Sequence, residues 1–173
     1  MDHPLDAGFS SVGSIAFDKN RNLLIADEGN CRIRRVDHNT GTIDTTVITE
    51  PLTACLEEAK NPISLMPSPT DLTIDSEGNV VFTETAENVV MRVDGHSATP
   101  SIIAGTGDRD FSGDNGPAVD AALSGPSGLV IDSKGNLYVG DIRNNRVRRV
   151  DAVTKTIETI AGNGGPDIVH SEE

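Results

Sequence analysis

Tryptophan is absent from the sequence, and the aromatic residues are limited to 4 Phe and 1 Tyr. A core must therefore be built from Val, Ile, Leu and Ala, which suits several narrow packed sheets better than one thick centre. No apolar run of about 18 residues occurs, which excludes a transmembrane helix at the level of the sequence. Residues 1–6 show no basic region followed by an apolar run, so we expect no signal peptide and a soluble chain. The cell compartment stays open.

Positive charge is scarce. Lys and Arg total 14 against 27 Asp and Glu, and the net charge is −13. This average field repels phosphate backbones and anionic lipid surfaces, which argues against nucleic acid or a membrane surface as the partner. The same balance favours a partner with a basic patch, or a divalent cation.

Cysteine is limited to Cys31 and Cys55. Two thiols do not make a disulfide framework, and the sequence has neither a CxxC pair nor a Cys/His cluster that would indicate structural zinc. The two thiols could be bridged or free, and the sequence does not decide between these states.

Glycine and proline, by contrast, are frequent at 17 and 9 residues, which indicates many turns between short segments. The segments Ile-Ala-Phe-Asp (15–18), Leu-Thr-Ile-Asp (72–75) and Leu-Val-Ile-Asp (129–132) begin 57 residues apart (72 − 15 and 129 − 72). With the same offset and no gap, two further sets of residues align: Asn22, Asn79 and Asn136, and then Asp27, Glu84 and Asp141. This period predicts three tandem copies of one structural unit.

Each copy is expected to form four short strands. In the third copy these lie near residues 128–131, 137–140, 146–150 and 156–161, separated by turns rich in Asp, Asn and Gly. Four strands of about five residues joined by tight polar turns make an antiparallel meander. No helical periodicity competes with this interpretation.

Such a sheet cannot bury both faces alone, so neighbouring copies must stack face to face in one domain that spans the whole chain. The copies are expected at approximately residues 11–48, 69–105 and 126–162. Two longer connectors, residues 49–68 and 106–125, lie between them and have room to carry a function.

Residues 125–141 and 145–151 closely resemble NHL repeats, and so does the connector sequence of residues 111–118. The resemblance covers residues 10–165 and is most specific in the third copy. The second copy departs from it, with Glu-Asn-Val-Val-Met at 87–91 where the other copies carry arginine-rich strands. The first copy lacks the usual Gly-Pro start.

The resemblance implies an all-β fold, a β-propeller in which each copy forms one four-stranded antiparallel blade. Such propellers commonly have six blades, so three blades would be half a ring. The chain is then expected to be a segment of a larger propeller or to pair with a second copy in a homodimer that closes the ring. The family includes proteins that mediate protein–protein contacts, proteins that bind RNA and a metal-dependent amidating lyase, so membership predicts the fold better than the activity.

An acidic column is the clearest chemical regularity. Asp27, Glu84 and Asp141 each end the second strand of a copy, and three carboxylates that converge on a ring axis could hold a cation. The alternative is that each carboxylate accepts backbone N–H bonds in its own loop, as a residue that recurs once per blade usually does. We favour the alternative and keep the column as a weak metal candidate.

The connector offers a second weak metal candidate in Asp108, Asp110 and Asp114. Their spacing, with Ser112 between and Gly113 at the sixth position, partly matches a calcium loop. The twelfth position is Val119 where a glutamate should stand, and no flanking helices are predicted. We therefore expect no cofactor, with calcium as the one weak candidate.

Arginines recur at 32, 34 and 35 and at 146, 148 and 149. Without interleaved aromatics they do not make an RNA-binding stripe, and pairing with Asp18, Asp132 or acidic neighbours across the strands is the favoured role. His38 and His96 fall out of register with each other, so the lyase-type metal site cannot be transferred to them. No Ser-His-Asp set is visible, although other blades could supply missing ligands.

The sequence therefore favours a non-catalytic interaction scaffold over an enzyme. The binding face would carry the turns between second and third strands and the long connectors, and its partner would be a protein or peptide with a basic patch. The residues predicted for this face are Asp27, Glu28, Glu84, Asp141, Arg143 and Asn144. The alternative is a divalent-metal-dependent propeller lyase or hydrolase whose site is completed by other blades.

Overall fold

The computed structural model describes residues 3–48, 69–94 and 100–165, and in them the chain forms three separate four-stranded antiparallel sheets. We refer to the sheets as blades 1, 2 and 3. Blade 1 contains β1 (Val12–Phe17), β2 (Leu23–Asp27), β3 (Arg32–Val36) and β4 (Ile43–Ile48). Blade 2 contains β5 (Asp71–Ile74), β6 (Val80–Glu84), β7 (Val89–Val93) and β8 (Ser101–Ala104). Blade 3 contains β9 (Pro126–Ile131), β10 (Leu137–Asp141), β11 (Arg146–Val150) and β12 (Ile157–Ala161).

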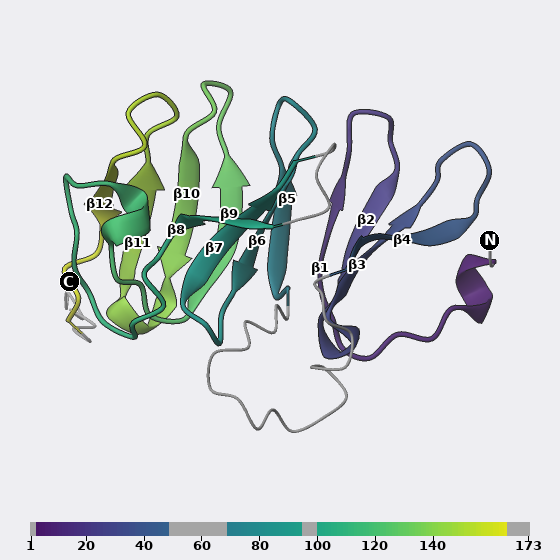
Figure 1. The fold of residues 1–173 in the computed structure, drawn as a ribbon, viewed down its shortest axis with the longest axis horizontal. Coiled ribbons are helices and arrows are strands. Elements are labelled where there is room, and N and C mark those ends of the chain that lie inside the picture. The colour runs from purple at the N-terminus through teal and green to yellow at the C-terminus, as the bar shows by residue number, and fades with distance from the viewer. Residues whose placement is uncertain (1–2, 49–68, 95–99, 166–173) are drawn as a thin grey trace, which may run out of the picture.

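Within each blade the strands pair in chain order, so every blade is a simple meander. The first strands of successive blades contact one another, β1 with β5 and β5 with β9. The three blades stand side by side in a row, with the described N-terminal segment at one end and the C-terminal strand at the other (Figure 1). The expectation of three four-stranded blades is confirmed.

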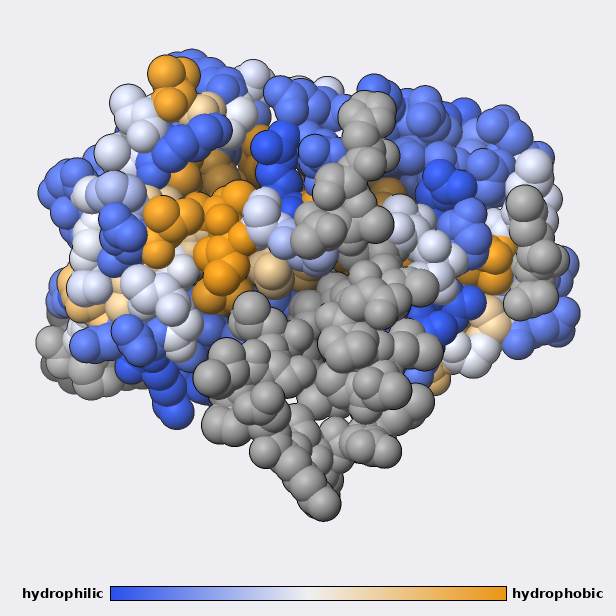
Figure 2. Space-filling view, viewed as in Figure 1, coloured by the Kyte–Doolittle hydropathy of each residue, from blue (hydrophilic) through white to orange (hydrophobic). Residues whose placement is uncertain are grey.

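Apolar side chains fill the two spaces between blades. The first cluster joins Leu24 and Ile33 of blade 1 to Leu72 and Phe82 of blade 2. The second cluster includes residues of blades 2 and 3 together with Ala118, Ala121 and Leu123 of the connector. Because strand residues alternate between the two faces, blade 2, which stands between the other two, is apolar on both sides. Figure 2 shows hydrophobic residues gathered where β8 and the connector cover the second space.

The turn between the first two strands has the same structure in all three blades. Asp132 accepts the backbone N–H groups of Lys134 and Asn136 at 2.9 Å and the Asn136 side-chain amide at 2.9 Å. Asp18 and Asp75 make the corresponding bonds in their own turns. The buried Asn136 in turn accepts the N–H of Ala152 at 3.0 Å, which ties this turn to the one between β11 and β12. These Asp-to-Asn turns are therefore structural.

These turns make the fold sensitive to acid. The Asn136 side chain and neighbouring backbone N–H groups lower the pKa of Asp132 to about 2, and backbone N–H bonds from Thr154 and Val153 lower that of Asp151. A carboxyl whose folded pKa is depressed stabilises the fold above its unfolded pKa of about 4, and that stability is lost as the pH falls through the folded value. We expect the urea concentration at the midpoint of unfolding to decrease as the pH is lowered from about 4 to about 2. The variant Asp132→Asn should lose less of its stability over this range, and an unchanged pH profile would contradict this assignment.

Candidate functional site

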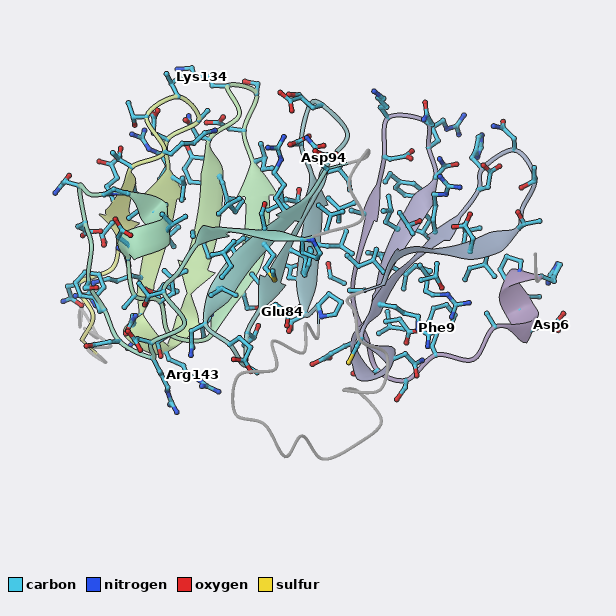
Figure 3. All side chains as sticks on the ribbon, viewed as in Figure 1. Asp6, Phe9, Glu84, Asp94, Lys134 and Arg143 are labelled. Atoms are coloured by element: carbon cyan, nitrogen blue, oxygen red, sulfur yellow. The ribbon has the colours of Figure 1, made fainter. Side chains whose placement is uncertain are left out.

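The turns between second and third strands lie at the opposite end of the blades from the Asp-to-Asn turns. They comprise η2 (Glu28–Asn30) in blade 1, residues 85–88 in blade 2 and η4 (Ile142–Asn144) in blade 3. The two ends of the connector of residues 105–125 also lie at this end. Its middle part, with the short turn η3 (Ala118–Asp120), runs along β12 toward the opposite end, where the Ala118 N–H donates to the Lys155 carbonyl. We refer to the three turns and the two ends of the connector as the loop face. Figure 3 shows Glu84 and Arg143 toward this edge of the molecule and Lys134 at the opposite edge.

Asp27 and Asp141 are fully buried beneath the loop face and make equivalent bonds. Asp141 accepts the backbone N–H of Ser124 at 2.7 Å and the Asn144 side-chain amide at 2.8 Å. Asp27 accepts the corresponding groups of Ser10 and Asn30, at 3.0 and 2.9 Å. Each carboxylate therefore fastens the segment that leads into its blade to the turn that follows β2 or β10. This is more than a bond within one turn, because the segment lies 17 residues away in the chain.

Arg148 of β11 is fully buried and fixes the connector from below. Its guanidinium lies 3.3 Å from an Asp141 oxygen and 2.8 Å from an Asp114 oxygen, and it donates to the carbonyl of Ser112 at 3.0 Å. The Phe111 ring covers it at 4.8 Å from the ring centroid. A buried guanidinium is costly unless carboxylates and carbonyls replace its water, and here two of each do so. The connector is consequently held in one conformation.

Further contacts fix both ends of the connector. Asn88 of blade 2 accepts the N–H of Gly125 at 2.9 Å and donates to the carbonyl of Gly107 at 3.2 Å. The Arg146 guanidinium stacks on Phe111 at 3.7 Å from the ring centroid. The loop face between blades 2 and 3 is therefore a preformed surface, which is the state that favours tight binding because little ordering remains to be done.

The acidic column does not contribute an exposed surface. Asp27 and Asp141 are completely buried and Glu84 is 1% exposed, so a partner on the loop face would not touch these carboxylates directly. Glu28 and Asn144 are half-buried and Arg143 is exposed, which leaves these three of the predicted face residues within reach of a partner. Blade 2 differs from the other two because Met91 stands where they carry Arg34 and Arg148.

The calcium-like spacing is used for other contacts. Asp114 pairs with Arg148, and the Ser112 hydroxyl accepts the N–H of Ala122 at 3.1 Å. Asp108 and Asp110 are exposed on the connector. Within the described ranges no group of three or more His, Cys, Asp or Glu side chains is placed to hold a metal ion. His96 lies outside those ranges, as does the connector of residues 49–68.

The arginine pairs differ in part from the sequence expectation. Arg35 pairs with Asp44 at 2.9 Å and Arg149 with Glu158 at 2.6 Å, both across neighbouring strands as expected. Arg148 pairs with Asp141 of the neighbouring strand and also with Asp114 of the connector, and the second contact is one that no strand register predicts. Cys31 is disulfide-bonded, and Cys55 lies outside the described residues. No helix in the described part of the chain is long and apolar enough to cross a membrane.

Comparison of the sequence with known families finds the NHL repeat over residues 123–149. The Arabidopsis thaliana protein SUPPRESSOR OF QUENCHING 1, chloroplastic, is 33% identical over 119 residues, which is 66% of this chain and 11% of that protein. Human NHL repeat-containing protein 2 is 34% identical over 99 residues, 56% of this chain and 13% of that protein. The chain thus spans a small part of the relatives that it matches.

Among solved structures, a Bacteroides thetaiotaomicron protein of unknown function aligns with a TM-score of 0.69 at 18% identity, over 88% of this chain and 36% of that one. A streptogramin B lyase aligns with a TM-score of 0.61 at 15% identity, over 92% of this chain and 43% of that one. A chain of a nidogen/laminin complex aligns with a TM-score of 0.62 at 16% identity, over 88% of this chain and 48% of that one. At sequence identities of 15–18%, these alignments show a shared fold alone.

Proposed function

Because this chain belongs to the NHL-repeat family and folds as three blades of a β-propeller, we propose that it is a non-catalytic scaffold that binds a protein or peptide through its loop face. The observation that carries the proposal is the fixed connector. Arg148, Asp141 and Asn88 hold it in place from beneath, and they leave its outer residues open to a partner. A fixed loop that carries exposed side chains on a rigid sheet is the usual construction of a protein-binding surface.

The exposed side chains suggest what the partner would look like. Asp108 and Asp110 are exposed on the connector, Glu87 is half-buried in the turn of blade 2, and Ile142 is 57% exposed in the turn of blade 3. Carboxylates and an exposed apolar side chain on one face suit a partner that presents a basic patch with an apolar residue, and the net charge of −13 would accelerate its approach. The nidogen/laminin complex supports this reading, since a similar fold takes part there in a protein complex.

The proposal is tested by selecting a displayed library of random peptides against the chain. We expect enrichment of peptides rich in Lys and Arg. The double variant Asp108→Asn/Glu87→Gln, which removes two negative charges from the loop face, should weaken the selected peptides by roughly tenfold, since each rim charge contributes about 0.5–1 kcal/mol.

A matched control distinguishes an effect of charges on the loop face from an effect of the net charge of the whole chain. The double variant Ser76→Lys/Ser133→Lys changes the net charge by the same two units in exposed turns at the opposite edge. It should leave peptide affinity nearly unchanged. If both double variants weaken binding equally, the peptides respond to net charge and the loop face is not the site.

The structural similarity to streptogramin B lyase favours one second candidate, a divalent-metal-dependent lyase or hydrolase whose site other blades complete. Thermal unfolding with calcium, zinc or EDTA discriminates between the two functions, because a ligand specific to the folded state raises the midpoint. The scaffold proposal expects no shift with any of the three. A rise with one metal that EDTA reverses would favour the enzyme.

A further inference from the structure

The row of blades leaves two unlike sheet surfaces uncovered. The head face is the side of blade 1 that points away from blade 2, and it exposes Ile15 and Phe17 by 59% and 68%. The tail face is the side of blade 3 that points away from blade 2, and it exposes Val130, Val147 and Ile160 by 58%, 37% and 46%. Strand alternation places these residues opposite those that pack between the blades. Exposed apolar surface of this kind on a sheet usually marks an interface.

The repeat shows what would cover the head face. Leu72 and Ile74 lie 57 residues after Ile15 and Phe17 (72 − 15 and 74 − 17), and both pack in the cluster between blades 1 and 2. The head face therefore has the composition of a face that a preceding blade covers.

The tail face has the complementary composition. Ile33 and Val90 occupy the position of Val147 in the earlier blades, and both are fully buried against the blade that follows. Val130 and Ile160 occupy the positions of Ala16 and Ile103, which likewise pack toward the following blade. The tail face thus has the composition of a face that packs against the head face of a following blade.

The backbone repeats the same complementarity. Between blades 2 and 3, the N–H groups of Gly105 and Thr106 donate to the carbonyls of Ala118 and Ala121 at 3.0 and 3.1 Å. Gly162 and Asn163 are the counterparts of the two donors, 57 residues later (162 − 105). Among the described residues neither has an acceptor for its backbone N–H.

The N-terminal segment carries the carbonyls that correspond to these acceptors in the repeat. The turn η1 (Pro4–Asp6) lies two periods before η3 (118 − 4 = 114) and has the same 3-10 form. The bond from Ser10 N–H to Asp27 matches the bond from Ser124 N–H to Asp141, so the segment follows the same path into its blade. By this correspondence Pro4 and Ala7 take the places of Ala118 and Ala121. Figure 1 shows that this segment and β12 lie at opposite ends of the row.

We propose that two copies of this chain dock head to tail, the tail face of each copy covering the head face of the other. In each of the two contacts Gly162 and Asn163 of one copy donate to the Pro4 and Ala7 carbonyls of the other, and Phe17 packs against Ile160. The occupant is a second copy because this chain itself carries both surfaces in matching register. A two-fold axis along the centre of the ring relates the copies, and six blades close the propeller. The inference is independent of what the loop face binds.

Light scattering of the purified chain tests the inference directly. The expected mass is twice 18.2 kDa. Phe17→Glu on the head face and Ile160→Glu on the tail face should each give a monomer, because every contact contains one head and one tail. The control Val153→Glu changes a residue that is 87% exposed in a turn off both faces and should remain a dimer.

Mixing the two monomeric variants decides the direction of docking. The Phe17→Glu chain retains a sound tail and the Ile160→Glu chain a sound head, so the mixture should form a dimer through one native contact. A head-to-head and tail-to-tail arrangement would instead leave Phe17→Glu dimeric through its tails. A monomer of the unmodified chain, a dimer of either single variant, or a mixture that stays monomeric would overturn the proposal.

Discussion

Replacing Arg148 by methionine should lower the free energy of unfolding by roughly 3–5 kcal/mol, because it leaves the buried Asp141 carboxylate without its charge partner. Methionine fits the backbone environment, since Met91 stands at the corresponding position of blade 2. The loss of stability should therefore come from the unpaired Asp141 carboxylate and from the connector carbonyls that no longer accept a hydrogen bond, and not from a strained methionine side chain. Urea unfolding monitored by circular dichroism measures it.

Two further variants show whether the buried pair is responsible. The double variant Arg148→Met/Asp141→Asn should recover part of the loss, because the charge that was stranded is also removed. Arg34→Met in blade 1 should cost less, about 1–2 kcal/mol, since Arg34 is 12% exposed and lies 3.5 Å from its only ion-pair partner among the described residues, Asp27.

Hydrogen exchange gives an independent readout of the same variant. The amides of Asn115 and Ala118 donate to carbonyls of blade 3 at 2.7 and 2.9 Å, and both should exchange faster in Arg148→Met. An Arg148→Met protein within about 1 kcal/mol of the parent, with unchanged exchange in the connector, would show that the connector is held by its apolar residues alone.

The blades were predictable because each is built from short-range interactions that repeat. The 57-residue period, the Asp-to-Asn turns and the strand alternation are all local, so they predicted four strands per copy. In the third copy a strand was expected near residues 128–131, and β9 runs over Pro126–Ile131. The added residues belong to the strand because Asp141 pairs with Pro126 across a bulge.

The role of the acidic column was predictable only in part. The period shows that a carboxylate recurs at the end of the second strand. It does not show whether that carboxylate is exposed on the loop face or buried beneath it. Its partners, Ser10 and Ser124, lie in segments whose path depends on how the blades stack. The same holds for Arg148, because its contact with Asp114 spans 34 residues of irregular chain. Arg34 makes a similar ring contact with Phe9 in blade 1, at 5.4 Å, but the repeat alignment gives no signal for it. Arg148 lies two periods after Arg34 (148 − 34 = 114), whereas Phe111 lies 102 residues after Phe9 (111 − 9).

Replacing Phe82 by alanine should also cost roughly 3–5 kcal/mol, because this ring is fully buried between blades 1 and 2 and its removal leaves a cavity. Phe82 lies opposite Leu72 and Met91 in its sheet, and all three belong to one cluster. The second cluster contains none of them. Hydrogen exchange should therefore accelerate in blade 1 and β5 far more than in β11 and β12, since contacts in repeat proteins join only neighbouring units.

Phe17→Ala is the matched comparison, because it removes the same ring from an exposed site. Both substitutions should be measured in the Ile160→Glu background, in which no dimer contact covers the head face. There Phe17→Ala should change the free energy of unfolding by less than about 0.5 kcal/mol, while Phe82→Ala keeps its full cost. In the parent chain Phe17→Ala should destabilise in a way that depends on protein concentration, because it weakens association and not the blade. Equal costs for the two substitutions in the monomeric background would mean that blade 1 already buries Phe17 and that the head face is not open for a partner.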